Sequence, residues 1–294
     1  MIENVYLATI LIRNLSEKMN FMQSITSILA KPVIHWLNKK KAVPSIPLCD
    51  YDKIRHELRP CDVILIEGRS RVSEIIKLIT QSPWSHACLY IGRIHNIEDE
   101  SLKKKVSECI NINPEDQLII ESELGTGTII RPLAYYKNEH IRICRPKGLT
   151  YQDAQIIYRY CISKLGFGYD IRQILDLARL LFPWWIMPRK WRSSLFKTHI
   201  GEYTKTVCST MIAESFNQVQ FPILPIVKIN ENKEIRFYRK NPKLCVPSDF
   251  DYSPYFEIIK YPFIDFNHHA DYRLLPWSGD LALLDKTPNE LDQK

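Results

Sequence analysis

Close pairs of cysteines are absent from this sequence, and their absence excludes several kinds of site. None of the eight cysteines forms a CxxC pair, so a zinc site or a thioredoxin-like redox motif has no support. A disulfide framework is not expected either, because the chain has 294 residues and its cysteines lie scattered within apolar runs. We therefore expect free thiols in a reducing compartment, which predicts the cytoplasm, and no metal or cofactor. The cysteines stand at positions 49, 61, 88, 109, 144, 161, 208 and 245.

Long apolar runs are missing too, and the excess of one charge sign is mild. The apolar stretch from Val5 to Ile12 is followed at once by Arg13, so no run approaches the roughly 20 residues of a membrane span. The basic start and small-residue cleavage site of a signal peptide are not found. A net charge of +7 fits a protein that meets anionic surfaces. It is too small to indicate nucleic-acid binding, and no nucleic-acid partner is expected.

The composition is that of one sizeable folded domain with additions. Apolar residues make up 45% of the chain and charged residues 25%, as in ordinary globular proteins. Glycine is scarce, with 9 residues, while 18 prolines predict many proline-punctuated loops. We expect an N-terminal helical extension at residues 1–42, the main domain at 43–270 and a C-terminal tail at 271–294.

The N-terminal extension has two interpretations. Its apolar residues recur near helical spacing, and Pro32 should kink or split the helix. The basic run Lys39 to Lys41 follows the apolar face, which favours a helix on a membrane surface or a partner. The other interpretation is a helix packed on the body of the protein, since apolar helical stripes usually face a core.

The main domain begins with a series of strands. Short β-rich runs separated by turn residues predict strands at 63–66, 87–91, 118–122, 128–131 and 141–144, and an amphipathic helix starts at Val72. The polar stretch 95–116 is expected to be a surface excursion. A helix should span 150–165, with Thr150 as N-cap and Gly166 at its end. Another helix follows Cys208, and the proline-rich, aromatic tail from 220 is expected to wrap the surface.

Cys208 is the first candidate for chemistry. It stands at the expected start of a helix, where exposed amides and the helix dipole favour a thiolate, the nucleophilic form of cysteine. Many cysteines at the edge of a helix are only small hydrophobic residues, so this position needs a partner to be informative.

His86 and Glu121 are the candidate partners. His86 leads an apolar strand and shares a face with Cys88 and Tyr90, and a nucleophilic cysteine needs such a base. A carboxylate at the end of an apolar strand is unfavourable unless it is paired. If the two strands are neighbours, Glu121 can hold the far nitrogen of the imidazole and stabilise its charged form. Glu123 lies on the same face and is a rival for this role.

The order of these pieces resembles the circularly permuted NlpC group of papain-like cysteine hydrolases, in particular its YiiX-like members. The resemblance covers roughly residues 55–260. Two positions depart from it: Cys61 stands where glycine is common, and Val207 where an aromatic residue is common. The matching motifs are Cys61-Asp62, Ser85-His86 through Gly92, Ile120-Glu121 with Gly127 to Ile130, Gly166 through Tyr169-Asp170, Cys208-Ser209 with Glu214 to Phe216, and the run from Pro247 to Glu257.

The resemblance implies a fold and an activity. The fold is α+β, with an antiparallel sheet packed against helices in the permuted papain-like arrangement. The activity is that of a cysteine hydrolase or acyltransferase that acts on an amide, ester or thioester bond through an acyl-enzyme. Cys208 would be the nucleophile, His86 its base and Glu121 the orienting residue. Tyr169 and Asp170 would line the substrate cleft, although such a pair can also simply close a turn.

A tryptophan-rich stretch lies between these motifs and the nucleophile. Trp184 and Trp185 stand close to Arg189 and Lys190, and such a mixture suits the interface of an anionic membrane. One interpretation is a lipid-facing wall of the cleft, with peripheral membrane contact and a lipid or lipidated substrate. The other is a loop whose tryptophans fill the core.

Two further alternatives remain open at this point. The chain can be a catalytically silent binding module of the same fold that docks to a membrane or partner through the Trp-rich basic segment. It can also resemble lecithin:retinol acyltransferase-like enzymes, which share the permutation but use a second histidine where this sequence has Glu121. His95 is nearby but follows the strand-ending Gly92, so it fits that role poorly. Small-molecule, lipid and peptide substrates all remain candidates, and the oligomeric state is open.

Overall fold

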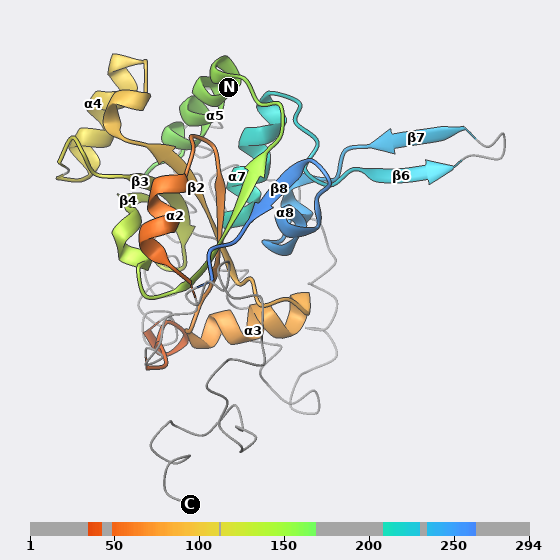
Figure 1. Cartoon of the computed structure of the whole chain (residues 1–294), viewed down its shortest axis with the longest axis horizontal. Coiled ribbons are helices and arrows are strands. Elements are labelled where there is room, and N and C mark those ends of the chain that lie inside the picture. The colour runs from red at the N-terminus through yellow and green to blue at the C-terminus, as the bar shows by residue number, and fades with distance from the viewer. Residues whose placement is uncertain (1–34, 43–48, 112, 169–207, 230–233, 263–294) are drawn as a thin grey trace, which may run out of the picture.

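A six-stranded antiparallel sheet organises the chain (Figure 1). The computed structural model describes residues 35–42, 49–111, 113–168, 208–229 and 234–262. The spatial order of the strands is β4-β3-β2-β1-β5-β8. Their bounds are β1 Val63–Glu67, β2 His86–Gly92, β3 Leu118–Glu123, β4 Gly127–Pro132, β5 His140–Pro146 and β8 Phe256–Ile259.

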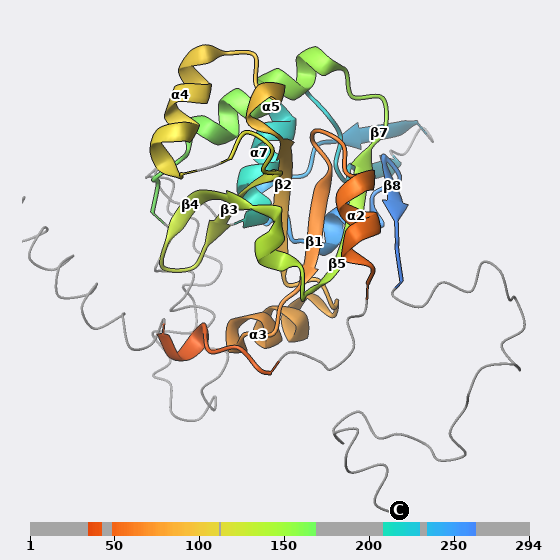
Figure 2. The ribbon, with the colours of Figure 1, turned by 60° about the vertical axis from the view of Figure 1, so that its left-hand side comes forward.

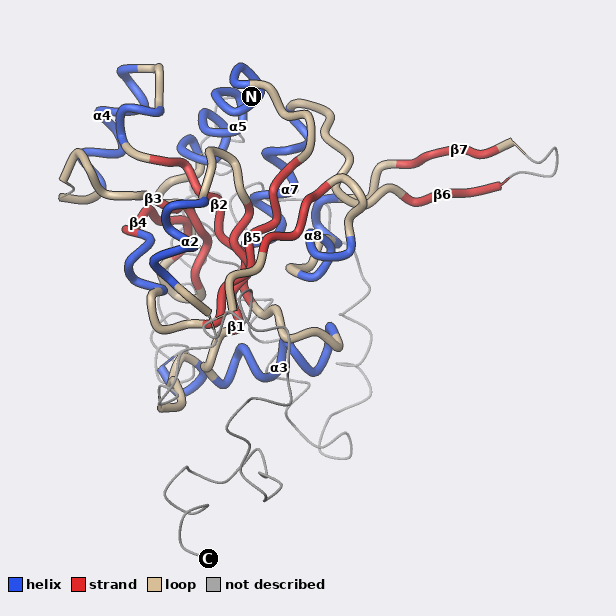
Figure 3. Tube along the Cα trace, viewed as in Figure 1, coloured by secondary structure: helices blue, strands red, loops and turns tan. Residues whose placement is uncertain are grey.

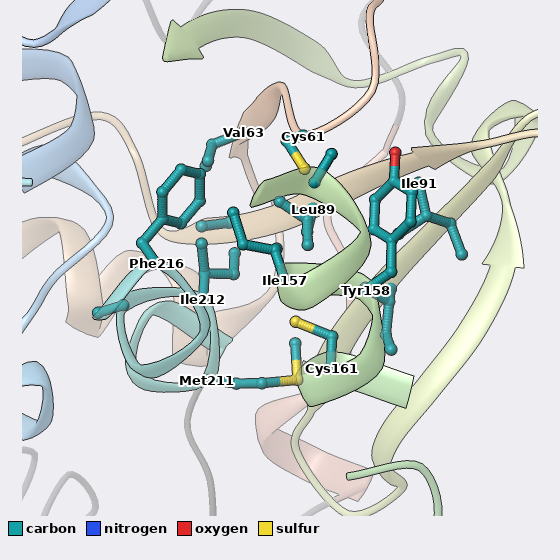
Figure 4. Close-up of a cluster of buried hydrophobic side chains, with 14 of the residues drawn as sticks. Cys61, Val63, Leu89, Ile91, Ile157, Tyr158, Cys161, Met211, Ile212 and Phe216 are labelled. Carbon is teal, nitrogen blue, oxygen red and sulfur yellow. The ribbon is translucent and has the colours of Figure 1, made fainter. Parts of the chain in front are cut away.

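Both faces of the central strands are covered. Along β2, Ala87, Leu89 and Ile91 belong to one buried cluster, whereas Cys88 and Tyr90 belong to another, as the alternation of a strand requires. The first cluster packs under α5 (Tyr151–Ser163) and α7 (Cys208–Gln218), as Figure 4 shows. The second packs under α2 (Tyr51–Glu57) and the 3-10 turn η2 (Leu133–Tyr136). Residues of β1 and β2 are therefore apolar on both sides.

The predicted helices at 72 and 150–165 are confirmed. The first is α3 (Arg71–Thr80), which lies across the lower end of the sheet in Figures 1 and 2. In the second, α5, the Thr150 hydroxyl accepts the Asp153 amide while the Asp153 carboxylate accepts the Thr150 amide, a reciprocal capping box. The five predicted strands are confirmed as β1 to β5.

The region 95–116 holds more structure than the sequence indicated. It contains the turn η1 (Ile94–Asn96) and the helix α4 (Glu100–Cys109), which Asp99 caps. Val106 of α4 is buried against the core, and α4 packs beside α5. The helix is charged on most sides, so its apolar spacing is too sparse to be recognised.

The expectation that the tail from 220 only wraps the surface is wrong. After α7 the chain forms a hairpin of β6 (Ile226–Ile229) and β7 (Ile235–Tyr238), the turn η5 (Pro242–Leu244) and helix α8 (Ser248–Tyr252). It then enters the sheet as β8, which pairs with β5. Phe250 and Phe256 are buried, and they pack in the core next to Phe216 instead of lying on the surface.

A buried ion pair fixes the start of the sheet. The Arg145 guanidinium donates to both carboxylate oxygens of Asp62, at 3.1 and 2.9 Å, and to Glu57 at 2.6 Å. The neighbouring Cys61 has a φ of 67°, in the left-handed region that favours glycine. That conformation explains physically why glycine suits this position.

The described part of the N-terminal extension, residues 35–42, rests on the body. Leu37 is buried, Lys40 forms an isolated bridge with Ser70, and the Lys41 amide donates to the Arg69 carbonyl at 3.0 Å. Residues 1–34 and the tail 271–294 lie outside the described residues, so the predicted segment boundaries stay predictions. The fold class is α+β, with an antiparallel sheet and packed helices. Among the described residues, no helix is long and apolar enough to span a membrane.

Candidate active site

Three different elements bring the candidate residues together at one end of the sheet. His86 is the first residue of β2, and Glu121 lies in the adjacent strand β3. Cys208 is the first residue of α7, which packs against both strands. The pairing of Leu89 with Ile120 and Tyr90 with Ile119 sets the β2–β3 register. It puts Glu121 on the same face as His86 and Cys88.

Glu121 is the centre of a buried hydrogen-bond cluster. Its Oε2 accepts from His86 Nε2 at 2.5 Å, from the Tyr136 hydroxyl at 2.6 Å and from the Cys88 thiol at 2.9 Å. Its Oε1 lies 2.6 Å from Nε of Arg131. Burial alone would raise the pKa of Glu121, but His86 and Arg131 outweigh burial and lower the pKa to about 2. The carboxylate is therefore ionised throughout the neutral range.

This cluster assigns the tautomer of His86. An ionised carboxylate can only accept, so His86 Nε2, the Tyr136 hydroxyl and the Cys88 thiol must each carry the hydrogen. When the ring is neutral, its Nδ1 is then the nitrogen with the free lone pair. Nδ1 is therefore the ring nitrogen that can accept the proton of the Cys208 thiol, as a general base must.

The side chain of Cys208 lies against the ring of His86. Hydrogen bonding from His86 and from the Ala87 and Ser209 amides favours the thiolate form of Cys208. Burial opposes a thiolate here, but the imidazolium charge and these hydrogen bonds outweigh burial, so the pKa of Cys208 is lowered. Burial likewise opposes the charged ring, and the negative groups at Cys208 and Glu121 raise the pKa of His86. The arrangement favours a thiolate–imidazolium pair.

The other cysteines have a different character. Burial raises the pKa of Cys61, Cys88, Cys144 and Cys245, so these thiols stay neutral. Cys109 is exposed on α4. Among the described cysteines, Cys208 thus combines a lowered pKa with a basic partner.

The remaining predicted residues separate into two groups. Glu123 does not contact His86, because it pairs with Arg131 at 2.5 Å and accepts from Thr126. Tyr169, Asp170, Trp184 and Trp185 lie outside the described residues, so their cleft-lining role stays a prediction. The Gly166 motif ends α5 beside β4, where the Thr128 amide donates to the Phe167 carbonyl at 3.0 Å.

Three residues of the cluster were not found from the sequence. Cys88 and Tyr136 donate to Glu121, and Arg131 supplies its counter-charge. The signal for Arg131 was present, since the β3–β4 hairpin pairs Arg131 with Ile119, on the face of Glu121, and a buried carboxylate needs a cation. Tyr136 comes from a turn after β4 and has no comparable pattern in the sequence.

His86, Cys88 and Glu121 also offer three possible metal ligands within 4.8 Å of one another. Their hydrogen bonding does not fit a metal centre. Glu121 Oε2 already accepts three hydrogen bonds, and the Arg131 guanidinium faces Oε1, where it would repel a second cation. The three donors on Oε2 and the Arg131 counter-charge beside Oε1 make the cluster a hydrogen-bonded ion-pair network and not a metal centre.

No protein-family model matches this chain, and no curated protein does. Among solved structures, it is similar to the metalloprotein yiiX from Escherichia coli O157:H7, with 13% sequence identity and a TM-score of 0.41. The alignment covers 69% of this chain and 97% of that chain. The similarity is weak, so the fold and the site described above rest on the geometry of this chain alone.

Proposed function

We propose that the chain is a cysteine hydrolase or acyltransferase with the permuted papain-like arrangement, acting on an amide, ester or thioester bond. The observation that carries the proposal is the contact of Cys208 with His86, while Glu121 holds the far side of the same imidazole. Catalysis by an activated cysteine requires a nucleophile in contact with a base, and a carboxylate that orients this base from its other side. The order along the chain, with histidine before cysteine, is the order of the permuted group.

The mechanism follows from the protonation states. His86 Nδ1 takes the proton of the Cys208 thiol, and the thiolate forms a bond to the acyl carbon. The tetrahedral intermediate collapses as the leaving group departs with the proton from His86, which leaves a thioester on Cys208. Water or another acceptor then gives its proton to His86, attacks the thioester and releases the thiolate. The first amides of α7 have no partner within the helix and suit the oxyanion.

Glu121 acts through His86 in this scheme. Its carboxylate stabilises the imidazolium that forms in each half-reaction and fixes the ring so that Nδ1 faces the sulfur. Arg131 and Tyr136 hold Glu121 in turn, so they are positioning residues. Among small-molecule, lipid and peptide substrates, the sequence of the Trp184-Trp185 segment favours a lipid or lipidated substrate, together with peripheral membrane contact.

The test is covalent labelling followed by intact-mass measurement. The background should be Cys109→Ser, because Cys109 is the exposed thiol among the described cysteines and would react nonspecifically. We expect a brief treatment with a fatty-acyl or a peptidyl chloromethyl ketone to add one label, and Cys208→Ala in the same background to add none. The better of the two probes indicates the substrate class.

An equal amount of label on both proteins, or none on either, would contradict the proposal. The chain would then be better described as a binding module of the same fold that docks through the Trp-rich basic segment. His86→Ala provides a second variant: it keeps the thiol but removes its base, so labelling should slow strongly without changing the site of modification.

A further inference from the structure

The hairpin β6–β7 stands apart from the rest of the fold. It forms its own two-stranded sheet and projects away from the body, as Figures 1 and 3 show. Every residue of both strands is exposed. A two-stranded hairpin is at best marginally stable alone in water, so a solvent-exposed hairpin of this kind gains from a surface to rest on.

The two faces of the hairpin differ sharply in chemistry. Val227 pairs with Phe237 and Ile229 with Ile235, so these four residues share one face. Their exposed fractions are 53, 65, 70 and 60%, and none of them is polar. The opposite face carries the cross-strand pair Lys228 and Arg236 next to the pair Ile226 and Tyr238, with the Lys228 ammonium over the Tyr238 ring.

The apolar face is too small for a stable protein partner. Four partly exposed side chains of this size present roughly 400 Å². A standard protein–protein interface needs about 800 Å² on each partner. A second copy of the chain seated on this face would therefore be held weakly, whereas a few inserted apolar side chains are enough for reversible binding to a bilayer.

The basic residues around the apolar face favour a bilayer with anionic headgroups. Lys228 and Arg236 have long stems that can carry their charges to the headgroup level beside a buried apolar face. Lys243 follows in η5, and Glu234 lies 3.5 Å from Arg236. Residues 226–229 and 234–243 contain five basic residues and one acidic residue. Lys240 is paired with Asp249 at 2.6 Å, and the positive charge of the other four complements anionic headgroups.

We propose that the β6–β7 hairpin docks the protein on an anionic lipid bilayer. Val227, Ile229, Ile235 and Phe237 insert at the boundary of the acyl chains, while Lys228 and Arg236 contact phosphate headgroups. Tyr238 is an aromatic residue of a type that prefers this interface, and Phe237 adds apolar surface to the inserted face. The proposal does not depend on the proposed catalysis, because it concerns binding only.

The hairpin is also tied to the helix of the candidate nucleophile at both ends. Phe221, just before β6, packs on Phe216 of α7, with ring centroids 5.2 Å apart. After β7, the Cys245 carbonyl accepts the Ser209 hydroxyl at 2.6 Å, in the first turn of α7. A docked hairpin would therefore hold α7 close to the membrane surface, where a lipid substrate would be found.

The experiment is co-sedimentation of the full chain with vesicles of phosphatidylcholine alone or of phosphatidylcholine with phosphatidylserine. The test variant is Ile229→Thr with Ile235→Thr, since threonine keeps the β-branched shape and strand propensity but removes apolar surface. Ile226→Thr, on the opposite face, is the matched control. Cys208→Ala separates docking from catalysis, and far-UV circular dichroism checks folding of every variant.

We expect the wild type to bind the phosphatidylserine vesicles and the double threonine variant to bind about tenfold more weakly. Ile226→Thr and Cys208→Ala should bind as the wild type does. Replacing Lys228 by Gln should weaken binding about fivefold, with most of the loss on the anionic vesicles.

Three results would overturn the proposal. One is a wild type that does not sediment with anionic vesicles. Another is equal binding by the double threonine variant and the wild type, which would shift membrane contact to another segment. The third is a wild type that is dimeric without vesicles while the double threonine variant is monomeric. That result would make this face an interface between copies of the chain.

Discussion

Replacing Glu121 with Gln should slow the reaction of Cys208 with electrophiles at mildly acidic pH. The substitution keeps the size of the side chain but removes the charge 2.5 Å from His86 Nε2. Loss of an opposite charge at such a distance shifts a pKa by about 1–3 units, so the imidazolium weakens and the pKa of Cys208 rises by about one to two units. A thiolate of higher pKa is also a better nucleophile, which offsets part of the loss of thiolate. The net effect is a rate about three- to tenfold lower at about pH 6.

The assay is the rate of alkylation by iodoacetamide as a function of pH, read by intact mass in the Cys109→Ser background. Glu123→Gln is the matched control, because it removes the same charge from the same strand but pairs with Arg131 and does not touch His86. The alkylation rate of the wild type and of the control should rise at a lower pH than the alkylation rate of the Glu121→Gln variant.

Two outcomes would refute this reasoning. If Cys208 titrates near the ordinary thiol value of about 8.5 in the wild type, no thiolate–imidazolium pair exists. If Glu121→Gln and Glu123→Gln have the same profile, the contact between Glu121 and His86 has no electrostatic effect on the nucleophile. Urea denaturation of each variant should accompany the rates, so that a loss of folding is not read as a loss of reactivity.

Three further predictions concern stability. The pKa of Glu121 is lowered from 4.5 to about 2, so its contribution, about 3 kcal/mol, is complete above about pH 4.5 and is lost as the pH falls toward about 2; urea titrations of wild type and Glu121→Gln across that window should converge at its acidic end. Asp62→Asn weakens the buried ion pair at the start of β1 while Arg145 keeps Glu57 as a partner, so it should lower the free energy of unfolding by about 1.5–3 kcal/mol, measured by urea titration. Gly127→Ala would put a Cβ 2.3 Å from the Phe167 carbonyl oxygen, whereas Gly148→Ala shares the positive φ but meets nothing within 4 Å. The first should therefore lower Tm clearly more than the second, and equal losses would show that only the φ strain, of about 1–3 kcal/mol, matters.

The sequence predicts the central part of the fold because that part is built from local patterns. The short apolar, β-rich runs after His86 and from Leu118 to Ile120 indicate strands, and successive side chains of a strand alternate between its two faces, so strand positions and faces follow directly. The same alternation puts Glu121 on the face where the structure has it in contact with His86.

What the sequence does not reveal depends on distant partners. The four residues of β8 include three strand formers, but nothing in the sequence indicates that they pair with β5, more than a hundred positions earlier. The helix α4 has only Leu102 and Val106 on its packed side, so its periodicity is weak. Tyr136 reaches Glu121 from a turn, and nothing in the order of residues indicates that direction.

The separation of the site residues along the chain has a consequence for the order of folding. His86 and Glu121 are 35 residues apart on neighbouring strands, so a growing chain can join them early. Cys208 lies more than three times as far from His86 and starts a helix that needs η5, α8 and β8 behind it. A nascent or truncated chain would therefore hold a prepared base without its nucleophile, and the thiol would become reactive only after the last strand of the sheet is in place.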